Sequence, residues 1–234
     1  MENTENQFSR TEMLFGKANL EKLKNCRVAV FGIGGVGGYT VEALVRSGIG
    51  SIDLIDSDTV DITNLNRQII ATKSTVGVLK TEAAKQRILD INPNTKVTTH
   101  NIFYSKDVSF EFTKFDYIVD AIDTVTSKIQ LIINAQNSNI PIISSMGTGN
   151  KLNAYELEVT DIYKTSVCPL ARIMRYELKK QGVKKLKVVY SKEQPIKPEI
   201  SGDGKIVPAS VAFVPACAGM IIAGEVIKDI LNIK

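Results

Sequence analysis

Short apolar runs alternate with segments of helical hydrophobic spacing along most of this chain. The run 27–33 is rich in β-branched residues and leads into a glycine cluster. After it, 35–47 has the pattern of a helix and 51–55 that of a second strand. A strand, a glycine turn, a helix and a strand within roughly thirty residues are typical of a βαβ unit with a parallel sheet.

The same alternation predicts the next elements: a helix at 80–89, strands at 96–100 and 117–119, a helix at 126–137 and a strand at 141–145. Strands that alternate with helices in this way favour a sheet covered by helices on both faces. The predicted fold class is therefore α/β, with a doubly wound, Rossmann-like and mostly parallel sheet.

The last part of the chain predicts a basic helix within 172–187, a loop at 192–205 rich in proline and glycine, a strand at 206–213 and a helix at 216–231. Residues 206–223 carry no charge, and their number is near the lower limit for a membrane span. Prolines and glycines interrupt this stretch, however. We therefore expect a strand and a buried helix there and no membrane span.

The cysteines are three in number, and no two form a Cys-x-x-Cys pair. The first residues lack the charged-then-apolar pattern of a secretion signal, so we expect a cytoplasmic protein without disulfides or structural zinc. Cys26 and Cys217 are expected in the core, and Cys168 as a small half-buried side chain rather than a redox group. The single histidine, His100, is expected at the surface rather than in catalysis.

The glycine cluster has the spacing of a nucleotide-binding turn, Gly32-Ile-Gly34-Gly35-Val-Gly37, between a strand and a helix. Glycines let the backbone approach a phosphate, and the following helix presents free N–H groups and the positive end of its dipole. Asp56 ends the second predicted strand, where a carboxylate can accept hydrogen bonds from ribose hydroxyls. Together these features predict a nucleotide site.

The polar run 56–68 favours ATP over a redox dinucleotide, because hydride transfer does not need it. A carboxylate that attacks the α-phosphate of ATP needs cations around the triphosphate and a metal ion, which Arg67, Lys80 and Asp123 can supply. The alternatives are structural: Asn64 caps a helix that begins there, and Asp123 caps the helix predicted at 126–137.

Five linked motifs within roughly residues 7–147 resemble the ubiquitin-activating-enzyme-like adenylyltransferases, which include the molybdopterin-synthase and thiamine-pathway enzymes. They are Gly32–Gly37, Asp56-Ser-Asp58, Asn64–Gln68, Val76-Gly77 with Lys80, and Ala121–Asp123. The resemblance implies that Asp56 binds ribose, that Asn64, Arg67 and Lys80 hold the triphosphate of ATP, and that Asp123 ligates Mg²⁺. Six further residues complete the implied nucleotide site: Gly32, Gly34, Gly35, Gly37, Asp58 and Gln68.

Near the start of the chain, Arg10 falls where such enzymes carry an arginine that reaches into the partner subunit's ATP site. The resemblance therefore implies a homodimer and a catalytic set of Arg10, Asn64, Arg67, Lys80 and Asp123. We expect a single adenylyltransferase domain over 1–234, with a nucleotide-binding core at 1–150 and a substrate-binding C-terminal extension at 151–234.

Positive charge is concentrated in one segment of the chain. Seven basic residues against the single acidic Glu177 lie there: Arg172, Arg175, Lys179, Lys180, Lys184, Lys185 and Lys187. An excess of this kind favours a partner rich in phosphate, with a solvated helix face as the alternative.

The second half, with Cys168-Pro-Leu-Ala-Arg172 and Val188–Pro195, resembles the tRNA threonylcarbamoyladenosine dehydratases. The resemblance implies that ATP adenylates the threonyl carboxylate of the modified adenosine. The carbamoyl group of the same side chain then displaces AMP, leaving a cyclic, oxazolone-type product. The basic segment would contact tRNA phosphates without regard to sequence.

Three other functions remain as alternatives. An adenylyltransferase for a ubiquitin-like sulfur carrier would need a hydrophobic docking surface rather than a basic one, and any sulfur-transfer partner is unknown. A non-catalytic scaffold has no need of the charged and polar residues at 10, 64, 67, 80 and 123. An NAD-dependent oxidoreductase fits the glycine turn and leaves the same residues unexplained.

Overall fold

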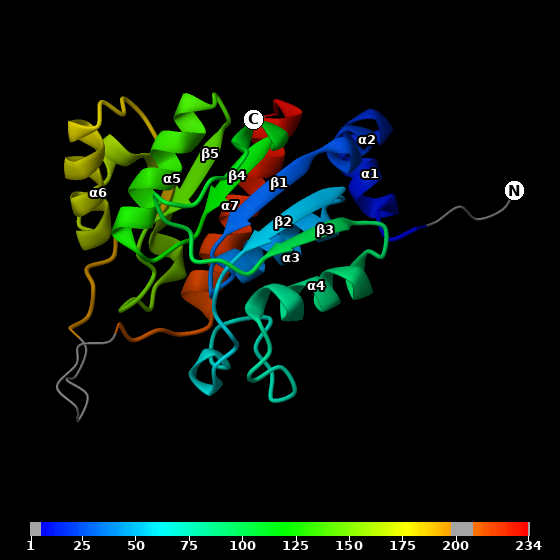
Figure 1. Ribbon diagram of the computed structural model, residues 1–234, viewed down its shortest axis with the longest axis horizontal. Helices are drawn as coiled ribbons and strands as arrows, with labels where there is room; N and C mark the ends of the chain where they lie inside the picture. The colour runs from blue at the N-terminus through cyan, green and yellow to red at the C-terminus, as the bar shows by residue number, and fades with distance from the viewer. Residues whose placement is uncertain (1–5, 198–207, 234) are drawn as a thin grey trace, which may run out of the picture.

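In residues 6–197 and 208–233, which the computed structural model describes, seven strands form one sheet in the order β3-β2-β1-β4-β5-β7-β6 (Figure 1). Neighbouring strands are parallel except β6 and β7, which pair antiparallel. The strands are β1 Arg27–Phe31, β2 Ser51–Ile55, β3 Lys96–His100, β4 Tyr117–Asp120, β5 Ile142–Ser145, β6 Leu157–Asp161 and β7 Lys187–Ser191.

Helices cover both faces of the sheet because the central strands are apolar on both sides. In β1, Val28 and Val30 belong to the core shared with α2, α3, α4 and α7, whereas Ala29 and Phe31 belong to the core shared with α5 and α6. The helices are α1 Ser9–Phe15, α2 Lys17–Asn25, α3 Gly37–Arg46, α4 Lys80–Ile91, α5 Val125–Asn137, α6 Pro169–Lys180 and α7 Phe213–Leu231.

The α/β, doubly wound fold class is confirmed. Strands β2 and β3 have the predicted bounds, and the helices and strands predicted between 80 and 145 agree with the structure to within two residues at each end. The C-terminal part of the chain joins the same sheet through β6 and β7, which the hydrophobic pattern did not predict.

The strand predicted at 206–213 is wrong over its described part, 208–213. Residues 208–212 are irregular and Phe213 already begins α7, while 206 and 207, like 198–205 of the predicted loop, lie outside the described residues. Pro215 looked like an interruption but lies in the first turn of the helix, where backbone N–H groups have no partner within the helix. The apolar run is therefore the entry of a buried helix.

Helix α7 packs closely against α3, and Gly219 permits the approach. A Cβ atom at Gly219 would lie 2.8 Å from the Cβ of Tyr39. Within the described residues, no helix is long and apolar enough to cross a membrane.

Candidate active site

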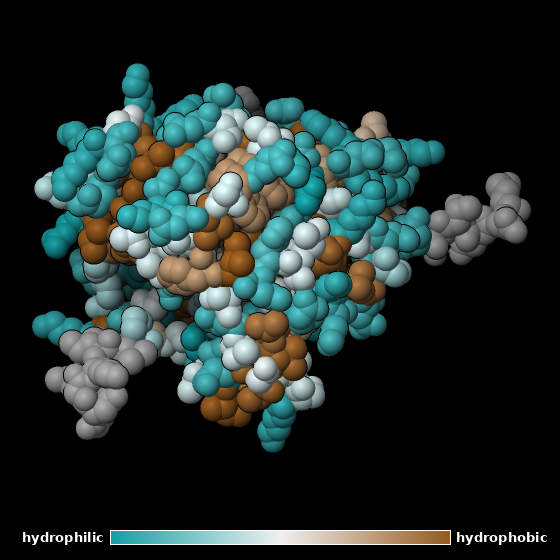
Figure 2. All heavy atoms as spheres, in the orientation of Figure 1, coloured by the Kyte–Doolittle hydropathy of each residue, from teal (hydrophilic) through white to brown (hydrophobic). Residues whose placement is uncertain are grey.

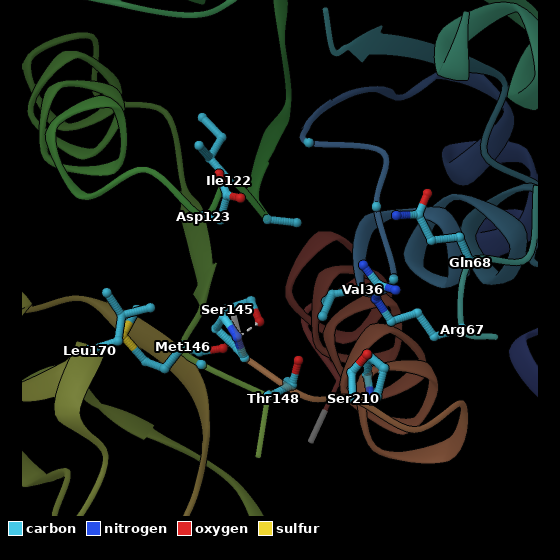
Figure 3. Close-up of a pocket in the computed structure, with 18 of the residues that line it drawn as sticks. Val36, Arg67, Gln68, Ile122, Asp123, Ser145, Met146, Thr148, Leu170 and Ser210 are labelled. Atoms are coloured by element: carbon cyan, nitrogen blue, oxygen red, sulfur yellow. Dashed lines mark hydrogen bonds between the residues drawn. The ribbon is translucent and has the colours of Figure 1, made fainter. Parts of the chain in front are cut away.

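A cavity of about 740 Å³ lies at the carboxyl ends of β1, β2, β4 and β5. The connections from β1 and from its neighbour β4 leave in opposite directions, so the cavity lies where open α/β sheets bind ligands. Figure 3 shows Arg67 and Gln68 on one wall and Met146 and Leu170 on the opposite wall. We refer to these as the nucleotide wall and the second wall.

The glycine turn forms part of the nucleotide wall, and its backbone is tightly packed. Gly32 has φ +87°, and its N–H donates to the carbonyl of Ile55 at 2.8 Å. A Cβ atom at Gly32 would lie 2.6 Å from the carbonyl oxygen of Ala121, and one at Gly37 would overlap the Gly32 carbonyl. Only glycine fits at these two positions, which supports the predicted close approach of a phosphate to the start of α3.

Asp56 follows β2, and its carboxylate connects the glycine turn to the segment after β2. Oδ2 accepts the backbone N–H of Ile33 at 2.6 Å, and Oδ1 accepts that of Asp58 at 2.9 Å. Each oxygen keeps a second lone pair, so the carboxylate can also accept hydroxyl groups of a ribose.

Lys80 begins α4, lines the cavity and is only 7% exposed. Its Nζ lies 2.7 Å from Oδ2 of the exposed Asp58. The ion pair orients the ammonium group. Asp58 therefore acts on the site through Lys80, although the two residues are far apart in the sequence.

Asn64 closes a short 3₁₀ turn, Ile62–Asn64. Its Oδ1 accepts the N–H of Asp61 at 3.1 Å, and the Asp61 carboxylate accepts the N–H of Thr63 at 2.8 Å. The Thr63 hydroxyl also donates to Asp61, and this hydrogen bond lowers the pKa of the Asp61 carboxyl group. Asp61 is therefore the N-cap residue of the turn, and Asn64 completes a capping box with it. Asn64 also lines the cavity.

The Arg67 side chain packs against the glycine turn. A Cβ atom at Gly35 would lie 3.5 Å from Arg67 Cγ. Nη1 donates to the Thr63 carbonyl and to Asn66 Oδ1, both at 2.9 Å, while the residue lines the cavity. The neighbouring Gln68 is buried, and its Oε1 has no hydrogen-bond partner among the described residues.

Asp123 lies in the turn after β4, exposed at the cavity. Thr124 is the N-cap residue of α5 and makes no side-chain capping bond, so Asp123 does not cap that helix. The described residues contain no group of three or more His, Cys, Asp or Glu that could hold a metal ion. A single carboxylate fits Mg²⁺ that arrives with ATP, because the phosphates and water supply the other ligands.

A buried lysine supports the turn that carries Asp123. Lys128 Nζ lies 2.9 Å from Asp120 Oδ2 and donates to the carbonyls of Ile122 at 3.1 Å and Ser145 at 2.8 Å. Asp120 Oδ2 also accepts the Ser144 hydroxyl, at 2.6 Å. The predicted site did not include this cluster.

The second wall comes from residues after β5 and from the start of α6. Cys168 is the N-cap residue of α6 and is 1% exposed, so it is fully rather than half buried. Val167 before it has φ +58°, a strained conformation for a β-branched residue. Lys151 on this wall was also not predicted from the sequence.

The sequence profile of the ThiF family matches residues 8–234. The chain belongs to the ThiF family.

This ThiF-family chain is 44% identical to a tRNA threonylcarbamoyladenosine dehydratase of Bacillus subtilis, over 97% of the chain and 95% of the relative. Two solved structures of the E. coli tRNA N6-threonylcarbamoyladenosine dehydratase, one with ATP and one with AMP, are 33% and 34% identical to this chain in sequence. Each has a TM-score of 0.88, and the match covers 97% of this chain and 94% of the E. coli chain. The adenylyltransferase and sulfurtransferase uba4 of Ogataea parapolymorpha is 37% identical over 66% of this chain and 39% of its own length.

Arg10 of the ThiF-family chain does not line the cavity. It is exposed on α1, beside Met13 and Leu14, which are 87% and 80% exposed. The structure thus brings Asn64, Arg67, Lys80 and Asp123 together at the cavity and leaves Arg10 apart from them.

The basic segment divides into exposed and engaged side chains. Arg175 Nη1 donates to the Thr165 carbonyl at 2.9 Å, and Lys187 in β7 pairs with Asp229 at 2.7 Å. Lys180 pairs with Glu177 at 3.1 Å and lies over the ring of Tyr176. Four others are exposed and make no ion pair among the described residues: Arg172, Lys179, Lys184 and Lys185.

The remaining predictions for cysteine and histidine are mixed. Cys26 is buried as expected, whereas Cys217 is only partly buried. His100 is part-buried outside the cavity, with Nε2 2.7 Å from Asp53 Oδ2. Figure 2 shows hydrophilic side chains over most of the visible face, with apolar side chains gathered in small groups between them.

Proposed function

We propose that this chain is an ATP-dependent tRNA threonylcarbamoyladenosine dehydratase. The observation that carries the proposal is the match to the B. subtilis dehydratase over nearly the whole of both chains, compared with 39% of the length of the sulfur-carrier type of relative. The meeting of Arg67, Lys80 and Asp123 at one cavity supports ATP as the co-substrate. The solved E. coli relative holds ATP and AMP.

In the proposed reaction, an oxygen of the threonyl carboxylate attacks the α-phosphorus of ATP. The bond to the β-phosphate breaks, and pyrophosphate leaves. The carbamoyl group of the same side chain then attacks the acyl carbon, and AMP leaves with the former carboxylate oxygen. The nucleoside has lost one water, and no enzyme nucleophile is required, because binding the large tRNA can position both reacting groups.

The chain's own residues bind the nucleotide and orient it. Arg67 and Lys80 provide positive charge for the triphosphate, and the glycine turn provides backbone N–H groups. Asp123 would hold Mg²⁺, and the bound ion would supply positive charge to the phosphate oxygens.

We also propose a homodimer in which Arg10 completes the ATP site of the partner subunit. The exposed apolar side chains next to Arg10 on α1 support this arrangement, because apolar surface of this kind is commonly covered by a partner. We further propose that the chain functions as one adenylyltransferase domain, since both halves contribute strands to one sheet, and that it functions in the cytoplasm, where tRNA is modified.

The exposed basic side chains after the start of α6 are proposed to bind tRNA phosphates. Reversing the charge of Arg172, Lys179 and Lys184 to glutamate is expected to weaken tRNA binding and to flatten its salt dependence. The slope of log affinity against log salt should fall by about 0.7–0.9 for each phosphate that the variant no longer neutralises. ATP binding should stay unchanged, because these residues lie outside the cavity. Superimposable salt plots for wild type and variant would contradict the proposal.

Asp123→Asn is expected to raise the Mg²⁺ concentration needed for half-maximal AMP formation more than it weakens ATP binding. An amide is a poorer ligand for a hard cation than a carboxylate. Magnesium titrations of wild type and variant provide the measurement. An unaltered magnesium requirement would remove Asp123 from the metal site.

Incubating the protein with ATP and tRNA that bears threonylcarbamoyladenosine tests the function directly. We expect mass spectrometry of the digested tRNA to show the nucleoside lighter by one water. An unchanged nucleoside, together with pyrophosphate exchange driven by a small sulfur-carrier protein, would favour the sulfur-carrier adenylyltransferase instead.

A further inference from the structure

Lys151 is a buried lysine on the second wall, and the proposed reaction steps give it no role. It is 3% exposed and yet lines the cavity, six residues after the end of β5. A buried ammonium group is costly unless hydrogen bonds or an opposite charge compensate it. Its surroundings therefore indicate what it binds.

Among the described residues, only one acceptor binds this ammonium group. Nζ donates to the Gly147 carbonyl at 2.7 Å, and the described residues provide it with no second hydrogen bond and no ion pair. An ammonium group has three N–H donors. The nearby Glu193 carboxylate accepts the backbone N–H groups of Leu152 at 2.9 Å and Asn153 at 2.8 Å, so it is already engaged.

Burial lowers the pKa of Lys151 below its usual value, and Cys168 and Glu193 act in the opposite direction. This direction agrees with the geometry, because the described residues form no ion pair with the ammonium group.

The distribution of charge around the cavity suggests the missing partner. Arg67 and Lys80 lie on the nucleotide wall, where they serve the triphosphate, whereas Lys151 is the one charged side chain among the described residues of the second wall. Met146 and Thr148, close to Lys151 in the chain, lie across the cavity from Arg67 (Figure 3). A group that approaches the α-phosphate from the second wall meets Lys151.

We propose that Lys151 binds an oxygen of the substrate carboxylate and holds that carboxylate against the α-phosphate of ATP. The inference rests on the proposed function and assigns the acyl subsite within the same cavity. After adenylation, the same ammonium group faces the carbonyl oxygen of the acyl adenylate. Lys151 is then a substrate-binding residue and makes no covalent bond.

The test compares two tRNAs that differ only at the reacting group: tRNA bearing threonylcarbamoyladenosine and the same tRNA with unmodified adenosine. Affinities are measured without ATP for wild type, Lys151→Met and Lys151→Gln. The second variant removes the charge but keeps a hydrogen-bond donor for Gly147. Lys192→Met removes an exposed lysine outside the cavity as a matched control.

We expect the ratio of affinities for modified and unmodified tRNA to fall by about 10- to 150-fold in both Lys151 variants. This factor corresponds to one hydrogen bond to a charged group. Affinity for unmodified tRNA, ATP binding and the thermal midpoint of Lys151→Gln should match those of Lys192→Met. An undiminished preference in folded variants, or an equal loss of affinity for both tRNAs, overturns the inference. If wild type itself neither prefers nor dehydrates the modified tRNA, the proposed function fails instead, which is a distinct result.

Discussion

Arg67→Ala and Lys80→Ala are each expected to slow AMP formation on modified tRNA by about 10²–10³-fold. This corresponds to roughly 2.7–4 kcal/mol of transition-state stabilisation, the loss seen when one preorganised donor to a developing oxyanion is removed. Both side chains line the same cavity as the glycine turn, and Lys80 is almost fully buried. Charge interactions are stronger where water is excluded, so solvent cannot easily replace the contribution of the buried Lys80.

Matched variants separate charge from geometry. Arg67→Lys keeps the positive charge but loses the planar fork that donates to Thr63 and Asn66, so it should fall between wild type and alanine. Asp58→Asn keeps the Lys80 ammonium and removes only the negative charge of its exposed partner, so it should cost less than Lys80→Ala. Rates are read from AMP release, with circular dichroism as the control for folding. Near-normal turnover in either alanine variant would remove that residue from the triphosphate site.

The fold between residues 27 and 145 could be predicted because its signals are local, whereas α1 and α2 before it were not predicted. Strands β2 and β3 are bounded by clear changes in pattern, and the glycine turn marks the start of α3. The nucleotide wall follows from the same property: most of its motifs are short runs of sequence that end a strand or begin a helix, and the parallel sheet brings those ends together.

The second half has weaker local signals. β6 is an edge strand whose residues are all only half buried, so it shows no clean alternation. β7 begins inside the basic segment, where Lys187 is bound to Asp229 and Glu225 of α7. The basic segment thus includes the end of a helix, a turn and the start of a strand. Composition alone could not show where one element ends and the next begins.

The second wall and the buried support of the site required tertiary structure. Nothing near Lys151 in the sequence shows that this residue is buried and lines a cavity. Lys128 had one local signal: it occupies the apolar face of α5, with Leu131, Ile132 and Ala135 three, four and seven positions further on. A lysine at such a position needs a buried partner, and the structure provides Asp120.

Lys128→Met is expected to lower the free energy of unfolding by about 3–5 kcal/mol, because it leaves the Asp120 carboxylate buried without its partner. Both side chains of the pair are fully buried, and Ser144 would be the remaining side-chain donor to Asp120. Urea unfolding provides the measurement. Lys24→Met, which breaks an exposed pair with Glu21, is the control and should cost less than about 1 kcal/mol.

The double variant Lys128→Met with Asp120→Leu distinguishes stability from function. Replacing a buried ion pair by apolar side chains is often neutral or stabilising, so much of the lost stability should return. Activity should stay low, because the ammonium group also joins the carbonyl of Ile122, in the turn that carries Asp123, to that of Ser145 at the end of β5. If the double variant recovered both stability and turnover, Lys128 would serve the fold alone, and the orientation of Asp123 would have to depend on other contacts.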